Sequence, residues 1–536
     1  MKKISVISAL MIVGISAMAQ DTYENARMLS GDLNGTARYV GMGGAMEALG
    51  ADISTISTNP AGIGMFRRSW AGLSLGAVSQ QGVNKFDNLS KTNMSFDQAG
   101  FVWASRTGES SYVNFAFNYR KGKNFDQILS ADAVMGQNSL SNVVFIKDAA
   151  GDYTLENKNG AWMGMYGRDL SNSFTQMDEV VANGMTMDDL TQTTAFTRDI
   201  AADDYYFDRA HRGWTADYDI NISGNIRDRF YWGVTLGIHD VNYHGYSDYE
   251  ERYWYTDNGV DNYPVNIALE DERWIDATGA DLKFGAIFLP IEESPFRIGL
   301  SLATPTWYEV KSENNTTFYN DLYRDGYLDW GNEKYSLSNV YEYKYYTPWK
   351  FGLSVGHTIN NCLALGASYE YSDMGAASTR IYNGRYNSYD EEQTDPDRVM
   401  NKHTDNTLKG VSLLKVGLEY KPDPSLAVRL GYNYQSSMYN EDGYKNTSLD
   451  SPSNAYVSTA DYTNWDATNR ITCGLGYKKD HLNVDLAYQY SVTKGTFYPF
   501  AADAVNFTDG TFVNPTSPAD VSFKRHQLLL TLGYTF

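Results

Sequence analysis

Aromatic side chains are the residues of this sequence most able to bind a ligand, since the chain contains 42 Tyr and 11 Trp. Large amphipathic rings can form an apolar capture surface for a hydrophobic molecule. They can equally form the aromatic girdle of strands that extend beyond a lipid bilayer. The richest segments are Tyr205 to Phe207, Tyr249, Tyr253 to Tyr255, Phe318 to Tyr319, Tyr323, Tyr327, Trp330 and Tyr341 to Trp349. Within them, Tyr253, Trp254, Tyr255 and Trp330 are the candidate ligand-capture residues.

Patterns typical of catalysis or metal binding are weak. The sequence has no Gly-x-Ser-x-Gly elbow, no His-Glu-x-x-His and no phosphate-binding glycine loop, so it predicts no catalytic residue and no enzyme. Of seven His, only His239 and His244 lie close together, which leaves haem ligation as an alternative. The acidic run Asp390 to Glu392, with Asp395 and Asp397, lacks ordered ligand spacing and is better explained as a solvated loop beside lipopolysaccharide. We therefore expect no metal site and no cofactor.

The first residues predict export. Lys2 and Lys3 precede an apolar stretch from Ile4 to Ile15, and Ala17 and Ala19 offer the small residues of a cleavage site. A signal peptide is therefore expected over residues 1–19, with the mature chain starting at Gln20. The formal charge of −21 argues against nucleic acid. After the leader, no apolar run reaches the ~20 residues of a membrane helix, and the mean hydropathy is −0.45.

Period-two alternation dominates from residue 69 to residue 536. Trp349, Phe351, Leu353 and Val355 alternate with Lys350, Gly352, Ser354 and Gly356, which is the pattern of a strand with one apolar face. Short connections alternate with long ones, as turns and loops do in outer-membrane barrels. The fourteen predicted strands lie near 69–81, 97–106, 111–121, 214–226, 230–243, 276–289, 295–304, 347–358, 363–372, 409–420, 425–435, 468–478, 481–490 and 524–536.

The two faces of these strands favour a transmembrane antiparallel β-barrel over a soluble sandwich or propeller, which is the alternative for alternating strands. Leu353 and Leu532 lie on the apolar face, which should contact lipid. The opposite face, which carries Lys350, Lys415, Glu419, Arg429 and Asp485 in regular strands, suits a polar lumen. The last strand alternates to Phe536, an ending expected to be recognised by the outer-membrane assembly machinery.

Residues 20–68 lack strand alternation and are rich in Gly, so they should pack closely inside the barrel as a hatch. The segment contains Gly35 to Tyr39, Gly41 to Ala45, Ala51-Asp52 and then Asn59-Pro60-Ala61-Gly62 directly before the first strand. This order resembles the FadL/TodX family, outer-membrane channels for long-chain fatty acids and aromatic hydrocarbons. The resemblance covers about residues 35 to 80 and assigns the family's hatch motif to Asn59, Pro60 and Ala61, with Gly62 beside it.

We expect a monomer, and transport should be passive because fourteen strands and about fifty plug residues do not fit the energy-coupled receptors of the outer membrane. The resemblance implies that the barrel binds a hydrophobic small molecule above the hatch and releases it sideways near the third strand. Asn59 should tie the hatch turn to the polar wall of the lumen. The segments 122–213 and 305–345 look long for a fatty-acid channel, and the family's pocket residues cannot be aligned. Two alternatives therefore stay open: uptake of haem or a similar amphipathic cofactor, and an adhesin or secretion-accessory barrel.

The two cysteines, Cys362 and Cys473, fall on the ninth and twelfth predicted strands. Three strand spacings of about 4.8 Å place them roughly 14 Å apart, beyond the ~7 Å Cα separation that a disulfide tolerates. Both should be free thiols.

Overall fold

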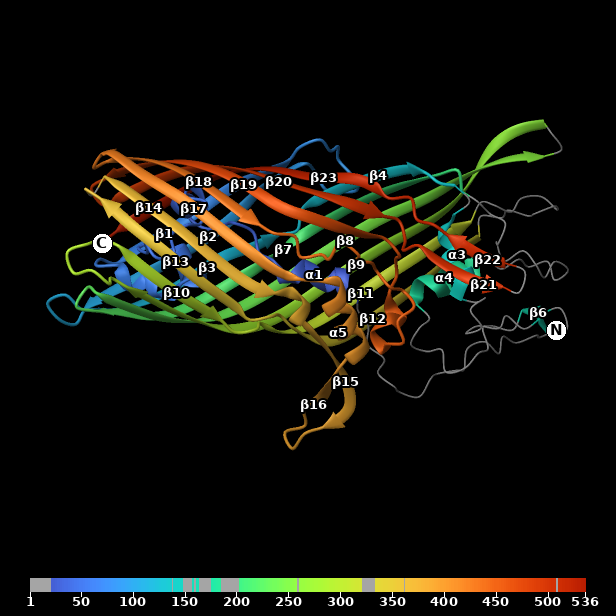
Figure 1. Ribbon diagram of the computed structural model, residues 1–536, viewed down its shortest axis with the longest axis horizontal. Coiled ribbons are helices and arrows are strands. Elements are labelled where there is room, and N and C mark those ends of the chain that lie inside the picture. The colour runs from blue at the N-terminus through green and yellow to red at the C-terminus, as the bar shows by residue number, and fades with distance from the viewer. Residues whose placement is uncertain are drawn as a thin grey trace, which may run out of the picture.

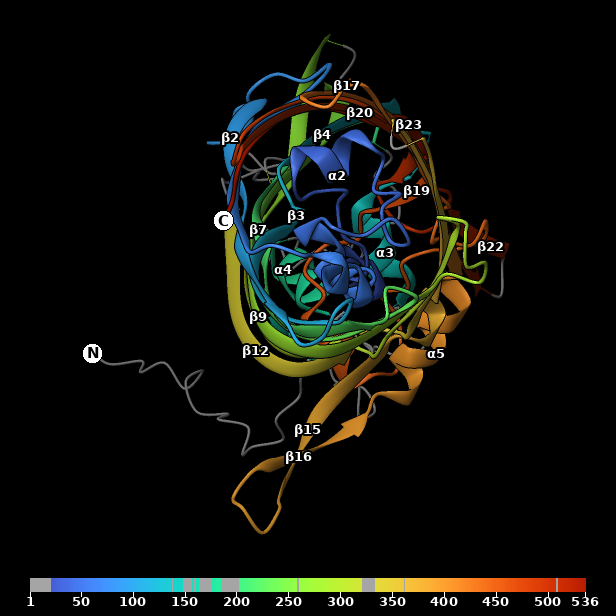
Figure 2. The same cartoon turned by 90° about the vertical axis from the view of Figure 1, so that its left-hand side faces the viewer.

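The structure, a computed structural model, describes residues 21–136, 138–147, 157–158, 161–162, 175–184, 202–257, 260–320, 333–360, 362–507 and 510–536. It is one antiparallel sheet that closes on itself, because the last strand pairs with the first, Leu532 opposite Leu73 (Figures 1 and 2). No helix in these ranges is long and apolar enough to cross a membrane. The expected signal peptide and its cleavage site after Ala19 lie outside the described residues.

Fourteen strands form the wall, and the third, seventh, eighth and ninth are interrupted, so that each of these carries two labels. In order they are β1 (Trp70–Gln80), β2 (Thr92–Arg106), β3 and β4 (Tyr112–Asn124, Gln127–Val134), β7 (Asp204–Ile226), β8 (Phe230–Asp257), β9 (Val260–Phe288), β10 and β11 (Arg297–Ala303, Trp307–Asn320), β12 and β13 (Glu333–Tyr346, Lys350–Ile359), β14 and β15 (Leu363–Asp373, Ser378–Tyr386), β17 (Gly410–Asp423), β18 (Leu426–Gln435), β19 (Tyr462–Lys479), β20 (Leu482–Tyr498) and β23 (Ala519–Thr535). The predicted strand number and the position of every predicted strand are confirmed.

Several strands are longer than the sequence pattern predicted, and β8 shows why. Near its start, Leu236 and Ile238 are exposed on the outside while Thr235 is buried on the inside. Further along, the exposed positions become polar at Asp240, while Tyr243 is buried. The apolar face thus changes sides where the strand leaves the membrane. Simple alternation therefore does not continue along the whole strand. For the same reason, the predicted long loop 305–345 is largely the strand pair β11 and β12.

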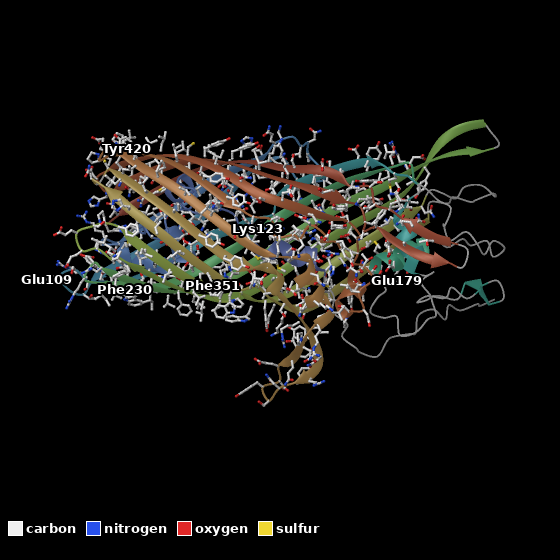
Figure 3. All side chains as sticks on the ribbon, in the orientation of Figure 1. Glu109, Lys123, Glu179, Phe230, Phe351 and Tyr420 are labelled. Carbon is white, nitrogen blue, oxygen red and sulfur yellow. The ribbon has the colours of Figure 1, made fainter. Side chains whose placement is uncertain are left out.

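The lower part of the wall has apolar side chains outside and charged ones inside. Leu353 is 51% exposed and its neighbour Ser354 5%, and Leu532 is exposed as expected. Lys415 and Arg429 are buried on the inner face. Figure 3 shows Phe230 and Phe351 on the outer surface. This distribution is that of a transmembrane barrel, and the short turns lie together at one end (Figure 1).

The N-terminal segment lies inside the ring (Figure 2). It forms α1 (Thr22–Leu29), α2 (Ala37–Gly41) and the 3₁₀ turns η1 (Ile53–Ser57) and η2 (Pro60–Met65). Asp21 caps α1 and Thr36 caps α2 through side-chain oxygens that accept backbone N–H bonds. Val40, Met42 and Met46 pack with Ala487 and Leu529 of the wall. Residues 21–66 therefore fill the lumen as a hatch.

The mouth at the end of the long loops is covered by α3 (Leu140–Lys147), α4 (Gln176–Gly184) and the hairpin of β21 (Asp503–Phe507) and β22 (Gly510–Asn514). Both helices pack into an apolar cluster with Tyr205, Phe207, Phe318, Phe497 and Phe500 of the wall and its loops. Smaller elements are β5 (Asn157–Lys158), β6 (Ala161–Trp162), η4 (Met374–Ala376), β16 (Glu392–Pro396), α5 (Arg398–Thr407) and η5 (Pro452–Tyr456).

Candidate functional site

The Asn59 to Gly62 turn is completely buried against the wall. Pro60 starts η2, and the Asn59 Oδ1 accepts the Ala61 N–H at 3.2 Å. Two wall glycines make this approach possible. A Cβ on Gly285 would lie 2.7 Å from the Ala61 nitrogen, and one on Gly233 would lie 2.8 Å from the same atom. The wall can hold the turn this closely only without side chains at these positions.

The expectation that Asn59 ties this turn to the wall is not what the structure shows. Its Oδ1 caps its own turn, and its buried Nδ2 has no hydrogen-bond partner among the described residues. An Asn directly before a helical turn accepts the nearby backbone N–H groups most readily, so Asn59 caps its own turn and does not bind the wall. The wall instead holds the hatch through Asn114, which donates to the Ile63 carbonyl at 2.7 Å, and Thr235, which donates to the Ile56 carbonyl at 2.9 Å.

Four of the five charged side chains predicted to line a polar lumen form ion pairs, Lys415 and Glu419 with the hatch and Arg429 and Asp485 with each other in the wall. Lys415 lies 2.5 Å from Glu47 of the hatch. Glu419 lies between Arg38 of the hatch at 2.9 Å and Arg429 of the wall at 2.7 Å. Removing one partner of such a pair leaves an uncompensated buried charge, so these contacts fix the hatch in place.

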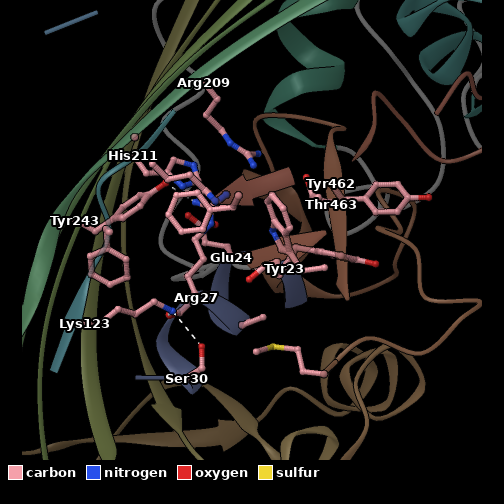
Figure 4. Close-up of a pocket in the computed structure, with 18 of the residues that line it drawn as sticks. Tyr23, Glu24, Arg27, Ser30, Lys123, Arg209, His211, Tyr243, Tyr462 and Thr463 are labelled. Atoms are coloured by element: carbon pink, nitrogen blue, oxygen red, sulfur yellow. Dashed lines mark hydrogen bonds between the residues drawn. The ribbon is translucent and has the colours of Figure 1, made fainter. Parts of the chain in front are cut away.

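A cavity of about 230 Å³ lies between α1 and the wall strands β7, β8, β19 and β23 (Figure 4). Tyr23, Tyr243, Tyr439, Tyr462 and Phe125 give it aromatic walls. Its volume lies below the ~300 Å³ at which ligand pockets usually begin. The cavity as it stands is therefore smaller than a usual pocket for a drug-sized ligand.

Three cations at this cavity, Arg27, Lys123 and Arg470, have no carboxylate within 4.0 Å in the described part of the chain. Lys123 donates to the Arg27 carbonyl at 2.5 Å and to the Ser30 hydroxyl at 3.2 Å, the bond dashed in Figure 4. Arg27 donates to the Tyr243 hydroxyl, and Arg470 donates to Asn433.

The other cations around the cavity are paired. Arg525 lies 2.9 Å from Asp32, Arg209 lies 2.8 Å from Asp461, and Arg273 pairs with Glu24 of α1. The lining as a whole is balanced, with seven cationic and seven acidic side chains, but Arg27, Lys123 and Arg470 have no carboxylate within 4.0 Å among the described residues. A buried or partly buried cation without a close carboxylate is poorly compensated, so the part of the cavity formed by these three cations is suited to an anionic group.

Ion pairs also hold the start of α1. Asp21 lies 2.9 Å from Lys445. Burial alone would raise the pKa of the Asp21 carboxyl, but the attraction of Lys445, its hydrogen bond and the Glu24 N–H bond outweigh it and lower the pKa to about 2. Asp21 is therefore ionised at neutral pH and contributes to the docking of α1.

A second cavity of about 180 Å³ lies further down the lumen and is lined mainly by polar and charged side chains. The His239 ring lies between Asp217 at 2.8 Å and Asp281 at 3.0 Å, and Lys283 bridges Asp281 and Asp219 at 3.0 and 2.9 Å. Ser30 to Asp32 of the hatch line both cavities and separate them. The axial route below this partition is therefore unfavourable for an apolar chain.

The wall is interrupted at the third strand, beside this partition. The β2–β3 ladder ends at Gln98 opposite Arg120. Residues 92–96 pair only with β1, while Lys121, Lys123 and Asn124 pair only with β7. The hatch covers this break. The Asp32 N–H donates to the Gly122 carbonyl at 2.8 Å, and the Asn34 side chain donates to Asp97 at 2.9 Å and to the Lys121 carbonyl at 3.0 Å.

The predicted capture residues do not line the cavity where the structure describes them. Tyr253 is buried in the mouth cluster and hydrogen-bonds Glu251. The side chains of Trp254 and Tyr255, and all of Trp330, lie outside the described residues. Arg27, Lys123 and Arg470, which sequence reasoning missed, come from the hatch, β3 and β19, and no local motif links them.

The two neighbouring histidines have different surroundings, and both cysteines are unpaired. His239 points into the lumen, whereas His244 pairs with Glu272 at 2.9 Å, and the described residues contain no group of three or more potential metal ligands. Cys362 and Cys473 are free thiols, and Cys473 is exposed on the outer face.

No family model and no curated protein matches this sequence. Its fold is similar to solved structures at 11–12% identity. A Pseudomonas aeruginosa FadL homologue has a TM-score of 0.48 and 11% identity, covering 95% of this chain and 99% of that one. The Ralstonia pickettii toluene transporter TbuX has a TM-score of 0.46 and 12% identity, covering 94% and 99%. The Pseudomonas putida toluene transporter TodX has a TM-score of 0.47 and 11% identity, covering 95% and 100%. These are the proteins whose family the hatch motif resembles.

Proposed function

We propose that this protein is a monomeric outer-membrane channel for the passive uptake of hydrophobic small molecules that carry a negative charge, such as long-chain fatty acids. The observation that supports it most directly is the cavity beside α1. Aromatic rings form part of its lining, and Arg27, Lys123 and Arg470 reach it with no carboxylate within 4.0 Å in the described part of the chain. An anionic headgroup would compensate these charges while the rings contact the apolar part of the ligand.

Release of this ligand is proposed to be lateral and to follow a shift of the hatch. The axial route passes the charged second cavity, whereas the break between β2 and β3 faces the bilayer. Transfer into lipid is favourable by about 0.8 kcal/mol for each CH₂ buried. Movement of Asp32 and Asn34 off the β3 edge would open that route, since these residues cover the break. Asn59 to Gly62 would act as the fixed base of the hatch.

Ligand binding with and without the charge tests the proposal. Purified protein should bind radiolabelled hexadecanoate more tightly than 1-hexadecanol, which has the same chain and no charge. Lys123→Met or Arg470→Gln should weaken hexadecanoate binding about 10- to 100-fold, the loss of one charged hydrogen bond of roughly 1.5–3 kcal/mol. Hexadecanol binding should change little.

Arg385→Gln, which removes an exposed cation far from the cavity on β15, is the matched control and should leave both affinities unchanged. Equal affinity for the acid and the alcohol, or no effect of either cavity variant, would contradict the proposal. Mass spectrometry of lipid extracted from the purified protein adds an independent readout, with a copurified fatty acid as the expected result.

Haem uptake is the second candidate, and His211 is the observation that favours it. The buried His211 Nε2 has no hydrogen-bond partner in the described part of the chain, and the ring lines the same cavity. A neutral imidazole in this state can ligate haem iron. A Soret band in the purified protein that disappears in His211→Ala would favour this candidate over the first.

A further inference from the structure

A hairpin leaves the barrel wall at the ninth strand. β15 pairs with the wall strand β12 over only three residues, from Ser378 opposite Tyr346 to Arg380 opposite Lys344. Beyond that it pairs only with β16, as in Ile381 opposite Asp395. Figures 1 and 2 show the hairpin projecting sideways out of the ring and slanting back toward the end that carries the short turns. It therefore lies beside the barrel and not over its mouth.

The point of departure lies just outside the apolar band. Tyr346, which pairs with Ser378, stands three residues before Trp349, and Trp349 is 47% exposed. Trp349 begins the outward-facing run that continues through Phe351 and Leu353. Trp and Tyr collect at the level of lipid headgroups, so this run marks the outer rim of the membrane. A hairpin that starts beyond this rim and slants back meets the headgroup layer.

The tip of the hairpin presents two tyrosines. Tyr386 is 62% exposed, and Tyr389, at 83%, is the most exposed aromatic side chain among the described residues. The tip is ordered, because the Asn387 side chain accepts the N–H groups of Tyr389 at 2.8 Å and Glu391 at 3.0 Å. An ordered turn that holds two amphipathic rings in the open favours contact with an interface that is partly apolar and partly wet.

We propose that the β15–β16 hairpin rests on the outer leaflet of the membrane, with Tyr386 and Tyr389 among the lipid headgroups. The neighbouring carboxylates, Asp390 and Glu391, limit its depth because ionised groups do not enter the hydrocarbon layer.

The root of the hairpin reaches the hatch. The Asn25 side chain of α1 donates to Thr379 of β15 at 3.2 Å, and Thr22 contacts Thr404 of α5 at 2.9 Å. Asn401 of α5 in turn binds the Thr379 carbonyl at 3.1 Å. A hairpin fixed on the membrane surface would therefore steady α1 from outside the barrel, whatever ligand the cavity takes.

A nitroxide spin label can measure the depth of the tip. The label is placed at Tyr389→Cys in a Cys362→Ser, Cys473→Ser background, and the protein is reconstituted in vesicles of lipopolysaccharide and phosphatidylethanolamine. Collision rates with oxygen, which concentrates in lipid, and with a water-soluble nickel chelate give the depth. Two labels calibrate the scale: native Cys473 on the lipid face, and Ser448→Cys on an exposed loop.

The expected result is a Tyr389 label between these references, with nickel accessibility at least threefold below that at Ser448. A lipid carrying the nickel chelate on its headgroup should broaden the Tyr389 signal strongly and the Ser448 signal weakly. Nickel accessibility at Tyr389 equal to that at Ser448, with no response to the chelating lipid, would overturn the proposal. A label at Tyr386→Cys should behave in the same way, so that one perturbed site does not decide the outcome.

Discussion

The close fit between hatch and wall predicts that one methyl group on the right wall glycine will loosen the hatch. In Gly285→Ala, the new Cβ would lie 2.7 Å from the Ala61 nitrogen and 2.9 Å from Pro60 Cδ. Ordinary contact needs about 3.5 Å or more, so the hatch turn must retreat by roughly 1 Å. These atoms belong to the backbone and to a rigid ring, so no side-chain rotation relieves the overlap.

Overpacking of this kind typically costs about 1–3 kcal/mol, and an energy of that size shifts a two-state equilibrium by about 5- to 150-fold. Gly285→Ala should therefore raise the population of an undocked hatch and the small-ion conductance in planar bilayers. Gly352→Ala is the matched control on the same wall, because its Cβ overlaps only the Ser301 hydroxyl, which can rotate away. If Gly285→Ala and Gly352→Ala both conduct like the unchanged protein, the hatch is not held by this contact.

Three further predictions follow from the lipid face, the start of α1 and the hatch as a whole. Leu353→Arg should destabilise the barrel by about 2–4 kcal/mol in reversible unfolding from lipid, and Ser354→Arg by clearly less. The reverse order would refute the assignment of Leu353 to the lipid side and Ser354 to the lumen side. The pKa of Asp21 is about 2 in the folded protein and 3.8 in a free chain, so its stabilisation of α1, about 2 kcal/mol, is present above pH 4 and lost as the pH falls through 2. The small-ion conductance should rise as the pH falls from 4 to 2, and Lys445→Met should abolish this pH dependence. A rise of the same size in that variant would show that the Asp21–Lys445 ion pair does not hold α1. Deletion of residues 21–58 should leave a folded barrel with a small-ion leak, and wild-type conductance and uptake in that variant would show that the hatch has no gating role.

The membrane-spanning strands were predictable because a single physical rule governs them. Each has lipid on one side and the hatch on the other, so Leu353 and Ser354 alternate as the pattern requires. The same rule fails above the membrane, where Tyr243 faces inward and Asp240 outward, and so the pattern does not predict the upper halves of β7, β8 and β9. A change of environment along one strand reverses the pattern without interrupting the chain.

The position of the hatch motif was predictable, but its contacts were not. A turn at Asn59 to Gly62 follows from the Pro and Gly that it contains, whereas the wall glycines that accept it, Gly233 and Gly285, are distant in sequence. The cations of the cavity could not be predicted for the same reason, because Arg27 and Arg470 come from opposite ends of the chain and meet only when the barrel closes. Their lack of a carboxylate within 4.0 Å in the described ranges is a property of the fold that no local sequence pattern predicts.

Uptake through a reversibly stapled hatch tests the central claim most directly. The hydroxyl oxygens of Thr22 and Thr404 lie 2.9 Å apart, so Thr22→Cys with Thr404→Cys, in a Cys362→Ser, Cys473→Ser background, should form a disulfide that fixes α1 to α5. Hexadecanoate uptake into proteoliposomes should fall at least tenfold when the staple is oxidised and recover when it is reduced, while each single cysteine variant transports normally. Unchanged uptake through a fully oxidised staple would contradict a mechanism in which this part of the hatch moves to admit the ligand.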